Sequence, residues 1–228
     1  MFFPIGDDNI KGGHRPIFSY SLILINVVIF GYEMQLGGGL NAFVRTYGAI
    51  PAEIMQGEDL FTLLTSTFLH GGIMHLLGNM LFLWIFADNI EAVVGNMRFL
   101  TFYLLGGFVA HAAHIAYDPS SIVPTVGASG AIAAVMGAYL VMFPRSRVRV
   151  LFLIFPFHIP AFIFLGLWIY FQLESGIGSL QMRGEQIGGV AYWAHIGGFV
   201  FGVLYGVYYR AARSMPPFGK QRLDHEIG

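Results

Sequence analysis

The chain has 228 residues, of which 56% are hydrophobic and 11% are charged, and its formal net charge at pH 7 is −1. Soluble domains carry about a quarter charged residues, so this composition indicates a membrane protein. The near-zero charge argues against nucleic-acid binding, and the absence of cysteine excludes disulfides, thiolate nucleophiles and cysteine-based zinc sites.

Hydrophobic stretches long enough to cross about 30 Å of hydrocarbon occur six times along the chain. A lipid-exposed strand would leave backbone polar groups unsatisfied, so all six are predicted to be helices. In chain order they are expected at residues 17–36, 70–88, 97–117, 128–143, 149–171 and 190–209. The predicted fold class is an all-α membrane protein, a six-transmembrane helical bundle.

These stretches predict one domain over residues 17–209, between an N-terminal segment (1–16) and a C-terminal tail (210–228). No signal peptide or Arg/Ser-rich transit segment stands ahead of the first hydrophobic stretch. Six spans without such a segment favour the plasma membrane of a bacterium or archaeon as the location.

The distribution of lysine and arginine predicts the orientation in the membrane. The first, third and fifth connections between spans hold only Arg45 and Arg183. The N-terminus, the second and fourth connections and the C-terminus hold Lys11, Arg15, Arg98, Arg145, Arg147, Arg149, Arg210, Arg213, Lys220 and Arg222. By the positive-inside rule, both termini are expected in the cytoplasm. The long first loop, about residues 37–69, is then expected at the outer interface.

Three polar residues inside the predicted spans share one depth. Ser129 and His195 each lie about 22 Å from the cytoplasmic end of their span, and His75 lies about 20 Å from the end of its own. Since the hydrocarbon core is ~30 Å thick, all three are expected some 8–10 Å below its outer surface. Ionisable groups at such depth are costly and usually functional.

The segment Gly127-Ala128-Ser129-Gly130 opens the fourth span and carries the candidate nucleophile. A serine hydroxyl is a poor nucleophile until a base takes its proton, and the His195 imidazole has a suitable pKa. The flanking glycines let backbones approach closely. A helix that starts at Ser129 also offers unpaired backbone N–H groups to an oxyanion. These residues predict a protease that cuts inside the bilayer.

Small residues predict how the two helices meet. Gly198, Gly202 and Gly206 form one stripe at four-residue spacing. Ser129, Ala133 and Gly137 form another, and the two stripes are expected to face each other, which would bring His195 to Ser129.

Other polar residues of the predicted spans are interpreted as donors or as structural groups. His75 and Asn79 share one helix face, so both side chains can donate toward the same point. His111 lies at a depth similar to that of His75, and it and His114 are interpreted as packing or interhelical hydrogen-bonding groups rather than catalytic ones. Glu91 is interpreted as a structural cap or ion-pair partner.

Several motifs in this order resemble the rhomboid intramembrane serine proteases, over about residues 59–209. They are Leu60-Phe61-Thr62, Phe68-Leu69-His70-Gly71-Gly72, His75-Leu76-Leu77-Gly78-Asn79-Met80, Glu91 to Gly95, Gly127-Ala128-Ser129-Gly130 and Ala194-His195-Ile196-Gly197-Gly198. The resemblance implies a rhomboid-type bundle in which Ser129 is the nucleophile and His195 the general base. It implies an oxyanion hole formed by His75, Asn79 and the Ser129 backbone N–H, with no metal or cofactor. It also implies single-span membrane proteins as substrates, cut at or near the outer end of the span.

A departure from the pattern of the family falls at the residue four places after Ser129. Many bacterial members have an aromatic residue four places after the nucleophile, where it stacks on the catalytic histidine, and this chain has Ala133 there. The sequence leaves open which residue orients His195.

Two alternatives of other classes stay open. A histidine-based metal or haem membrane protein would use His75, His111, His114 and His195, but it leaves the Gly-Ala-Ser-Gly segment and Asn79 unexplained. A non-catalytic binder of transmembrane segments would need neither Ser129 nor His195. The physiological substrate, the oligomeric state and the helix that admits substrate are not predicted.

Overall fold

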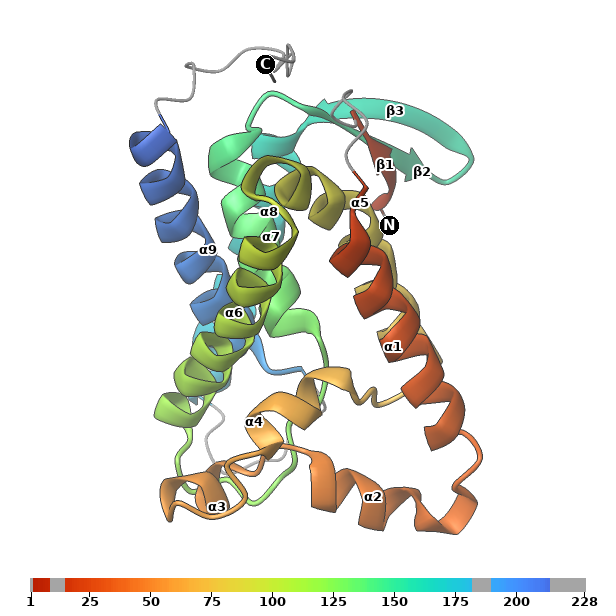
Figure 1. Ribbon diagram of the computed structural model, residues 1–228, viewed down its shortest axis with the longest axis vertical. Coiled ribbons are helices and arrows are strands. Elements are labelled where there is room, and N and C mark those ends of the chain that lie inside the picture. Colours follow the sequence, from red (N-terminus) through yellow and green to blue (C-terminus); the bar gives the residue numbers. More distant parts are fainter. Residues whose placement is uncertain (1, 9–14, 182–189, 214–228) are drawn as a thin grey trace.

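The computed structural model describes residues 2–8, 15–181 and 190–213, and most of this part is helical (Figure 1). Of the basic residues used above to predict orientation, Lys11, Arg183, Lys220 and Arg222 lie outside the described residues. Parts of the predicted terminal segments 1–16 and 210–228 also lie outside them.

The long helices form a bundle with α7 at its centre (Figure 1). They are α1 (Ile17–Glu33), α5 (Ile73–Val94), α6 (Asn96–Tyr117), α7 (Ser129–Met142), α8 (Ala161–Gln181) and α9 (Tyr192–Arg213). Helix α7 contacts α5, α6, α8 and α9, and every residue from Gly130 to Tyr139 is buried. Its glycines and alanines let these neighbours approach closely. The N-terminal end of α7, where Ser129 lies, is thereby held inside the bundle.

A three-stranded antiparallel sheet lies at one end of the bundle (Figure 1). Its strands are β1 (Phe2–Asp7), β2 (Arg147–Phe152) and β3 (Phe155–Pro160), in the order β1-β2-β3. Strand β2 pairs with both others, so the first residues of the chain are held against the segment that follows α7.

This sheet corrects the prediction of an all-α fold with a fifth span at residues 149–171, which is wrong over residues 149–160. Pro156 and Pro160 lack a backbone N–H and favour extended neighbours, so α8 begins only at Ala161. In β2, buried Val148 and Val150 alternate with exposed arginines, the period of a strand. Strands are disfavoured where their backbone is exposed to lipid, whereas these strands pair with one another at the end of the bundle.

Within the described residues, three helices are long and apolar enough to cross a membrane: α5, α6 and α8. A fourth candidate is α1 taken together with residues 37–47, which turn away from it by 112°. Helix α7 is apolar but has only 14 residues, which spans about 21 Å. The structure thus supports a helical membrane bundle with three to four candidate spans among the described residues. The number of six spans stays a prediction.

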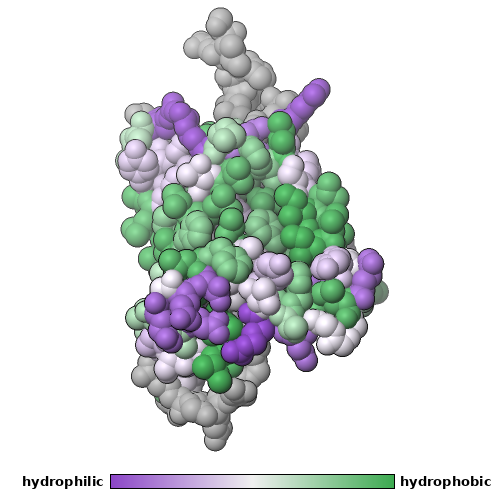
Figure 2. Space-filling view, turned by 60° about the horizontal axis from the view of Figure 1, so that its bottom comes forward, coloured by the Kyte–Doolittle hydropathy of each residue, from purple (hydrophilic) through white to green (hydrophobic). Residues whose placement is uncertain are grey.

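The surface has the character of a bilayer-facing protein. Figure 2 shows a broad band of hydrophobic residues across the visible face, with hydrophilic residues gathered above and below it. Large apolar side chains are exposed on several of the long helices, among them Leu24 on α1, Leu167 on α8 and Leu204 on α9. An exposed apolar surface of this extent fits contact with lipid rather than with water.

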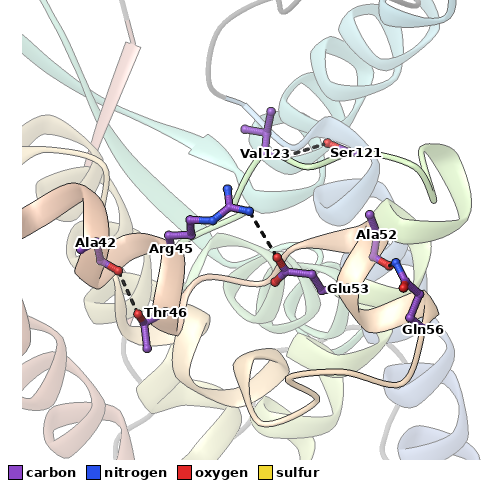
Figure 3. A network of polar contacts seen from close by, with 8 residues as sticks. All are labelled: Ala42, Arg45, Thr46, Ala52, Glu53, Gln56, Ser121 and Val123. Carbon is purple, nitrogen blue, oxygen red and sulfur yellow. Dashed lines mark hydrogen bonds and ion pairs between the residues drawn. The ribbon is translucent and has the colours of Figure 1, made fainter.

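The first loop consists of short helices connected by turns. They are η1 (Gly37–Gly39), α2 (Leu40–Tyr47), α3 (Pro51–Met55), α4 (Thr62–Thr65) and η2 (Ser66–Phe68). Figure 3 shows its polar contacts, including an exposed ion pair from Arg45 Nη2 to Glu53 Oε1 at 3.4 Å. The backbones of Ala49 and Thr125 exchange hydrogen bonds of 3.0 and 2.8 Å. This bridge fixes the loop against the segment that leads to Ser129.

Glu91 near the end of α5 caps the start of α1, as the sequence analysis expected. Its carboxylate accepts the backbone N–H groups of Phe18 and Ser19 at 2.9 and 2.8 Å and the Ser19 hydroxyl at 2.6 Å. The side chain is fully buried, so these bonds satisfy helix-end donors that water does not reach.

Replacing Glu91 with alanine is expected to lower the free energy of unfolding by about 3 kcal/mol, because buried N–H donors lose charge-assisted bonds. Thermal unfolding of the purified protein measures this. The matched control is Glu53→Ala, which removes an exposed ion pair and is expected to cost about 1 kcal/mol or less. Equal losses in the two variants would contradict the capping role of Glu91.

Asp7 connects β1 to the bundle. Its Oδ2 accepts Asn89 Nδ2 of α5 at 2.7 Å and also accepts the Tyr139 hydroxyl of α7. Burial raises the pKa of the Asp7 carboxyl from 3.8 to about 7, although the hydrogen bond from Tyr139 acts in the opposite direction. The neighbouring carboxyl groups of Asp88 and Asp8 raise this pKa further.

This raised pKa predicts a pH dependence of stability. The folded protein holds a proton on Asp7 that the unfolded chain releases above pH 3.8. The stability that this proton contributes is fully present below pH 3.8 and is lost as pH rises through about 7. The free energy of unfolding is expected to fall by about 1 kcal/mol between pH 6 and pH 8 through this group. Asp7→Asn should remove that part of the pH dependence, which thermal unfolding at several pH values measures. The same pH dependence in Asp7→Asn and wild type would contradict the role of Asp7.

Candidate functional site

Ser129 and His195 lie in contact where α7 and α9 cross. Ser129 Oγ is 2.7 Å from His195 Nε2. On its other side, His195 Nδ1 lies 2.8 Å from Gln172 Oε1 of α8. An amide oxygen can only accept, so Nδ1 carries the proton and Nε2 is free to accept the serine hydroxyl. The histidine is therefore held in the tautomer that a base for Ser129 requires.

The contact depends on the close approach of α7 and α9. A Cβ atom at Gly198 would collide with the carbonyl oxygen of Gly130, and one at Gly202 with that of Ala134. A Cβ at Gly137 would collide with the carbonyl oxygen of Phe199. The crossing therefore excludes any side chain at these glycines.

The glycine stripe of α9 thus faces α7. At its far end Gly206 lies against Ala138 and Val141. The predicted partner stripe was Ser129, Ala133 and Gly137, whereas the α7 backbone atoms nearest the glycines belong to Gly130, Ala134 and Ala138, each one residue further along. Ala133 still contributes, since its Cβ is 3.4 Å from the Cβ position of Gly198.

Helix α8 supplies the neighbours of His195 that sequence reasoning missed. Gln172 binds Nδ1, and the Trp168 ring lies 5.8 Å from the imidazole, centroid to centroid, at an interplanar angle of 40°. An aromatic neighbour is thus present although position 133 is alanine. A polar glutamine inside an apolar helix was the available signal. The predicted span ended at residue 171, which placed Gln172 in a loop.

His75 and Asn79 lie on α5 beside Gly127, two residues before Ser129. A Cβ at Gly127 would lie 2.8 Å from His75 Nε2 and 3.7 Å from Asn79 Nδ2. The backbone N–H of Gly71 donates to His75 Nδ1 at 3.4 Å, so Nε2 carries the ring proton. Asn79 Nδ2 is buried and has no hydrogen-bond partner among the described residues. Two donors therefore converge on the start of α7.

Gly127 itself has a backbone conformation that favours glycine, with φ +126°. A side chain there would also meet the His75 ring. Its N–H donates to the Ser66 carbonyl at 2.9 Å, which fixes the turn before the nucleophile. The positive φ and the close approach together explain why a glycine stands two residues before Ser129.

His111 supports this turn from α6. Its Nε2 lies 3.0 Å from Ser66 Oγ, and both side chains are buried. The expectation that His111 makes a hydrogen bond between elements is confirmed. Because the Ser66 carbonyl accepts the Gly127 N–H, His111 stabilises the segment before Ser129 through its bond to Ser66.

The histidines do not assemble as metal ligands in the part of the chain that the structure describes. No three histidine, aspartate or glutamate side chains there come together in an arrangement that could hold a metal ion. A metal-ion site built from His75, His111, His114 and His195 therefore gains no support from the described residues.

The chain is similar in sequence to known proteins of one family. A family model of the Rhomboid domain matches residues 57–212. Rhomboid protein 1, mitochondrial, from Saccharomyces cerevisiae is 29% identical over 199 residues, covering 86% of this chain and 54% of that protein. Rhomboid protease GluP from Bacillus subtilis is 33% identical over 134 residues, covering 58% of this chain and 26% of that protein.

The human presenilin-associated rhomboid-like protein, mitochondrial, is 28% identical over 207 residues, covering 88% of this chain and 50% of that protein. The chain thus spans about half the length, or less, of these three relatives. Two of the three carry mitochondrial names and one is bacterial, so they do not support the predicted location in a prokaryotic plasma membrane.

Proposed function

Because the chain belongs to the rhomboid family of integral membrane proteins, we propose that it is an intramembrane serine endopeptidase with a Ser129–His195 dyad. One observation carries the proposal: Ser129 Oγ lies 2.7 Å from a His195 nitrogen whose opposite nitrogen is bound by an amide oxygen. A nucleophile, a base within hydrogen-bond reach and a group that orients the base are the parts that activate a serine.

In the first half of the proposed reaction, Ser129 Oγ attacks the carbonyl carbon of the scissile peptide bond while His195 Nε2 takes the hydroxyl proton. The carbonyl oxygen becomes an oxyanion. His75 Nε2–H and Asn79 Nδ2–H are the side-chain donors placed to receive it, and the Ser129 backbone N–H is the third. The free Asn79 donor supports this role, because a buried amide without a partner is costly unless a ligand uses it.

In the second half, His195 gives its proton to the leaving amine nitrogen, and an acyl ester remains on Ser129. Water then attacks the ester carbonyl carbon while His195 Nε2 takes a proton from the water. The bond from that carbon to Ser129 Oγ breaks, His195 returns the proton to Oγ, and the carboxylic acid leaves. Throughout, the Gln172 oxygen accepts the Nδ1–H bond and stabilises the imidazolium form.

The same proposal includes the number of spans and their orientation in the membrane. The six long helices form six spans, both termini lie in the cytoplasm, and residues 17–209 form the protease domain between terminal segments 1–16 and 210–228. The end of the bundle that carries β2 and three nearby arginines would then be cytoplasmic, which the positive-inside rule supports. Substrates would be single-span membrane proteins cut near the outer end of the span, and the prokaryotic plasma membrane remains a prediction.

The experiment that tests the function combines labelling and cleavage in proteoliposomes. Wild type should react with a fluorophosphonate at Ser129 and cleave a model single-span protein, with or without a metal chelator. Ser129→Ala should do neither. Cleavage by Ser129→Ala would overturn the proposal. Absence of both labelling and cleavage in folded wild type would favour the non-catalytic binder instead.

Gln172 is expected to be a positioning residue for His195. Replacing it with leucine should lower kcat about 10–100-fold with little change in KM, because the imidazole loses the partner that fixes its tautomer. Gln172→Glu keeps an oxygen acceptor and should retain more activity than the leucine variant. The neighbouring change Leu173→Ala, on an exposed side chain, is the control. Equal activity of Gln172→Leu and wild type would contradict the role.

A further inference from the structure

An open groove lies between α6 and α9, away from Ser129, and has a volume of about 470 Å³. The two helices run side by side and contact each other, and the groove lies toward the ends at which α6 begins and α9 finishes (Figure 1). The residues that define its character are Arg98, Phe102, Leu105, Phe201, Tyr205 and Arg213. None of the described residues that line it is acidic.

A continuous series of rings forms the wall of this groove. Phe102 stacks on Phe201 at 5.8 Å and on Tyr205 at 4.2 Å between ring centroids. Tyr205 stacks in turn on Tyr209 at 6.1 Å. The Tyr209 hydroxyl donates to the carbonyl of Val93 at 2.7 Å, which fixes this ring against the end of α5. The wall is therefore aromatic along its length, and the Tyr209 ring is held by its hydrogen bond to α5.

The charges gather at one end of the wall. The Arg213 guanidinium lies 5.9 Å from the centroid of the Tyr209 ring, and Arg98 stands on the first turn of α6. Both side chains are exposed, and neither forms a salt bridge with a described carboxylate. Two arginines without a described carboxylate partner therefore line the same groove as the aromatic wall.

The dimensions fit one leaflet of a bilayer. Phe201 and Arg213 are about 18 Å apart along α9. The hydrocarbon thickness of one leaflet is about 15 Å, so a ligand with its anionic group at Arg98 and Arg213 would place its chain beside Phe201 and Leu105. Basic pockets between transmembrane helices on the cytoplasmic side bind anionic lipid head groups by this arrangement.

We propose that the α6–α9 groove is a binding site for an anionic glycerophospholipid. Arg98 and Arg213 bind the phosphate, and the acyl chain lies along Phe102, Tyr205 and Phe201. A zwitterionic lipid would carry a positive group toward the same arginines and is bound less well. The site is independent of the dyad, and its occupancy does not depend on whether the chain cleaves peptides.

Native mass spectrometry of the purified full chain tests this with added phosphatidylglycerol or phosphatidylcholine of matched acyl chains. Wild type should retain phosphatidylglycerol preferentially. The double change Arg98→Gln with Arg213→Gln should weaken retention about thirtyfold, from the loss of two arginine–phosphate contacts. The matched control is Arg147→Gln with Arg149→Gln, which removes two exposed arginines of β2 at the same end of the bundle and should leave retention within about twofold of wild type.

A second variant tests the apolar half of the site. Thr101→Trp places a large ring in the groove, keeps both arginines and should displace phosphatidylglycerol. Free glycerol 3-phosphate should not compete, because it lacks the chain that the aromatic wall contacts. Retention unchanged by the groove variants, equal loss in the Arg147/Arg149 control, or efficient competition by glycerol 3-phosphate would each overturn the proposal.

Discussion

Gly202→Val is expected to lower the free energy of unfolding by at least about 3 kcal/mol, the upper range for overpacking, and to abolish reaction with a fluorophosphonate. A Cβ at this position would collide with the carbonyl oxygen, the carbonyl carbon and the Cα of Ala134, all backbone atoms that cannot rotate away. Helices α7 and α9 must therefore separate, and Ser129 must move from His195. Thermal unfolding and fluorophosphonate labelling measure the two effects.

The matched control is Gly166→Val on α8, where nothing lies within 4 Å of the Cβ position. It introduces the same side chain into a helix of the same bundle and should change stability by less than about 1 kcal/mol, as surface changes usually do. Wild-type labelling by Gly202→Val would show that the α7–α9 contact is not what brings the dyad together.

His195→Ala is expected to lower kcat by about four orders of magnitude or more, because Ser129 loses the only base in contact with its hydroxyl among the described residues. Residues that act as one unit are not additive in their effects, so combining this change with Ser129→Ala should cause no further loss. Single-turnover cleavage of a model single-span protein measures both.

Thermal unfolding accompanies that measurement, since each variant must remain folded for its activity to be informative. The matched control is His111→Ala, which removes a buried histidine that bonds Ser66 rather than Ser129. It should reduce stability but preserve far more activity than His195→Ala. If the double variant were much less active than either single variant, the two residues would act independently rather than as a dyad.

Residues 147–160 form strands β2 and β3, although part of this segment was predicted to belong to a spanning helix. Mean hydropathy treats apolar strands and spanning helices alike, so residues 149–171 met the length and composition of a span. Proline at 156 and 160 and the alternation of Val148 and Val150 with arginine were the local signals of strands. The partner strand β1 comes from the first residues of the chain, and no local pattern indicates a pairing across such a separation.

The sequence by itself determined the class of molecule and the chemical groups. Its apolar stretches indicated a helical membrane protein, and its motifs indicated the rhomboid family to which the chain belongs. Ser129, His195, His75 and Asn79 could be named because a polar residue in an apolar span is rare and costly, which makes it visible in the sequence alone.

Only the tertiary structure decided how those groups meet. The glycines of α9 rest on Gly130, Ala134 and Ala138, one residue beyond the predicted stripe, because the crossing angle and depth of two helices follow from their whole packed surfaces. Gln172 and Trp168 reach His195 from α8, a helix whose position depends on contacts far from the motifs. Sequence spacing fixes which residues share a helix face, whereas contacts between helices arise from packing across the bundle.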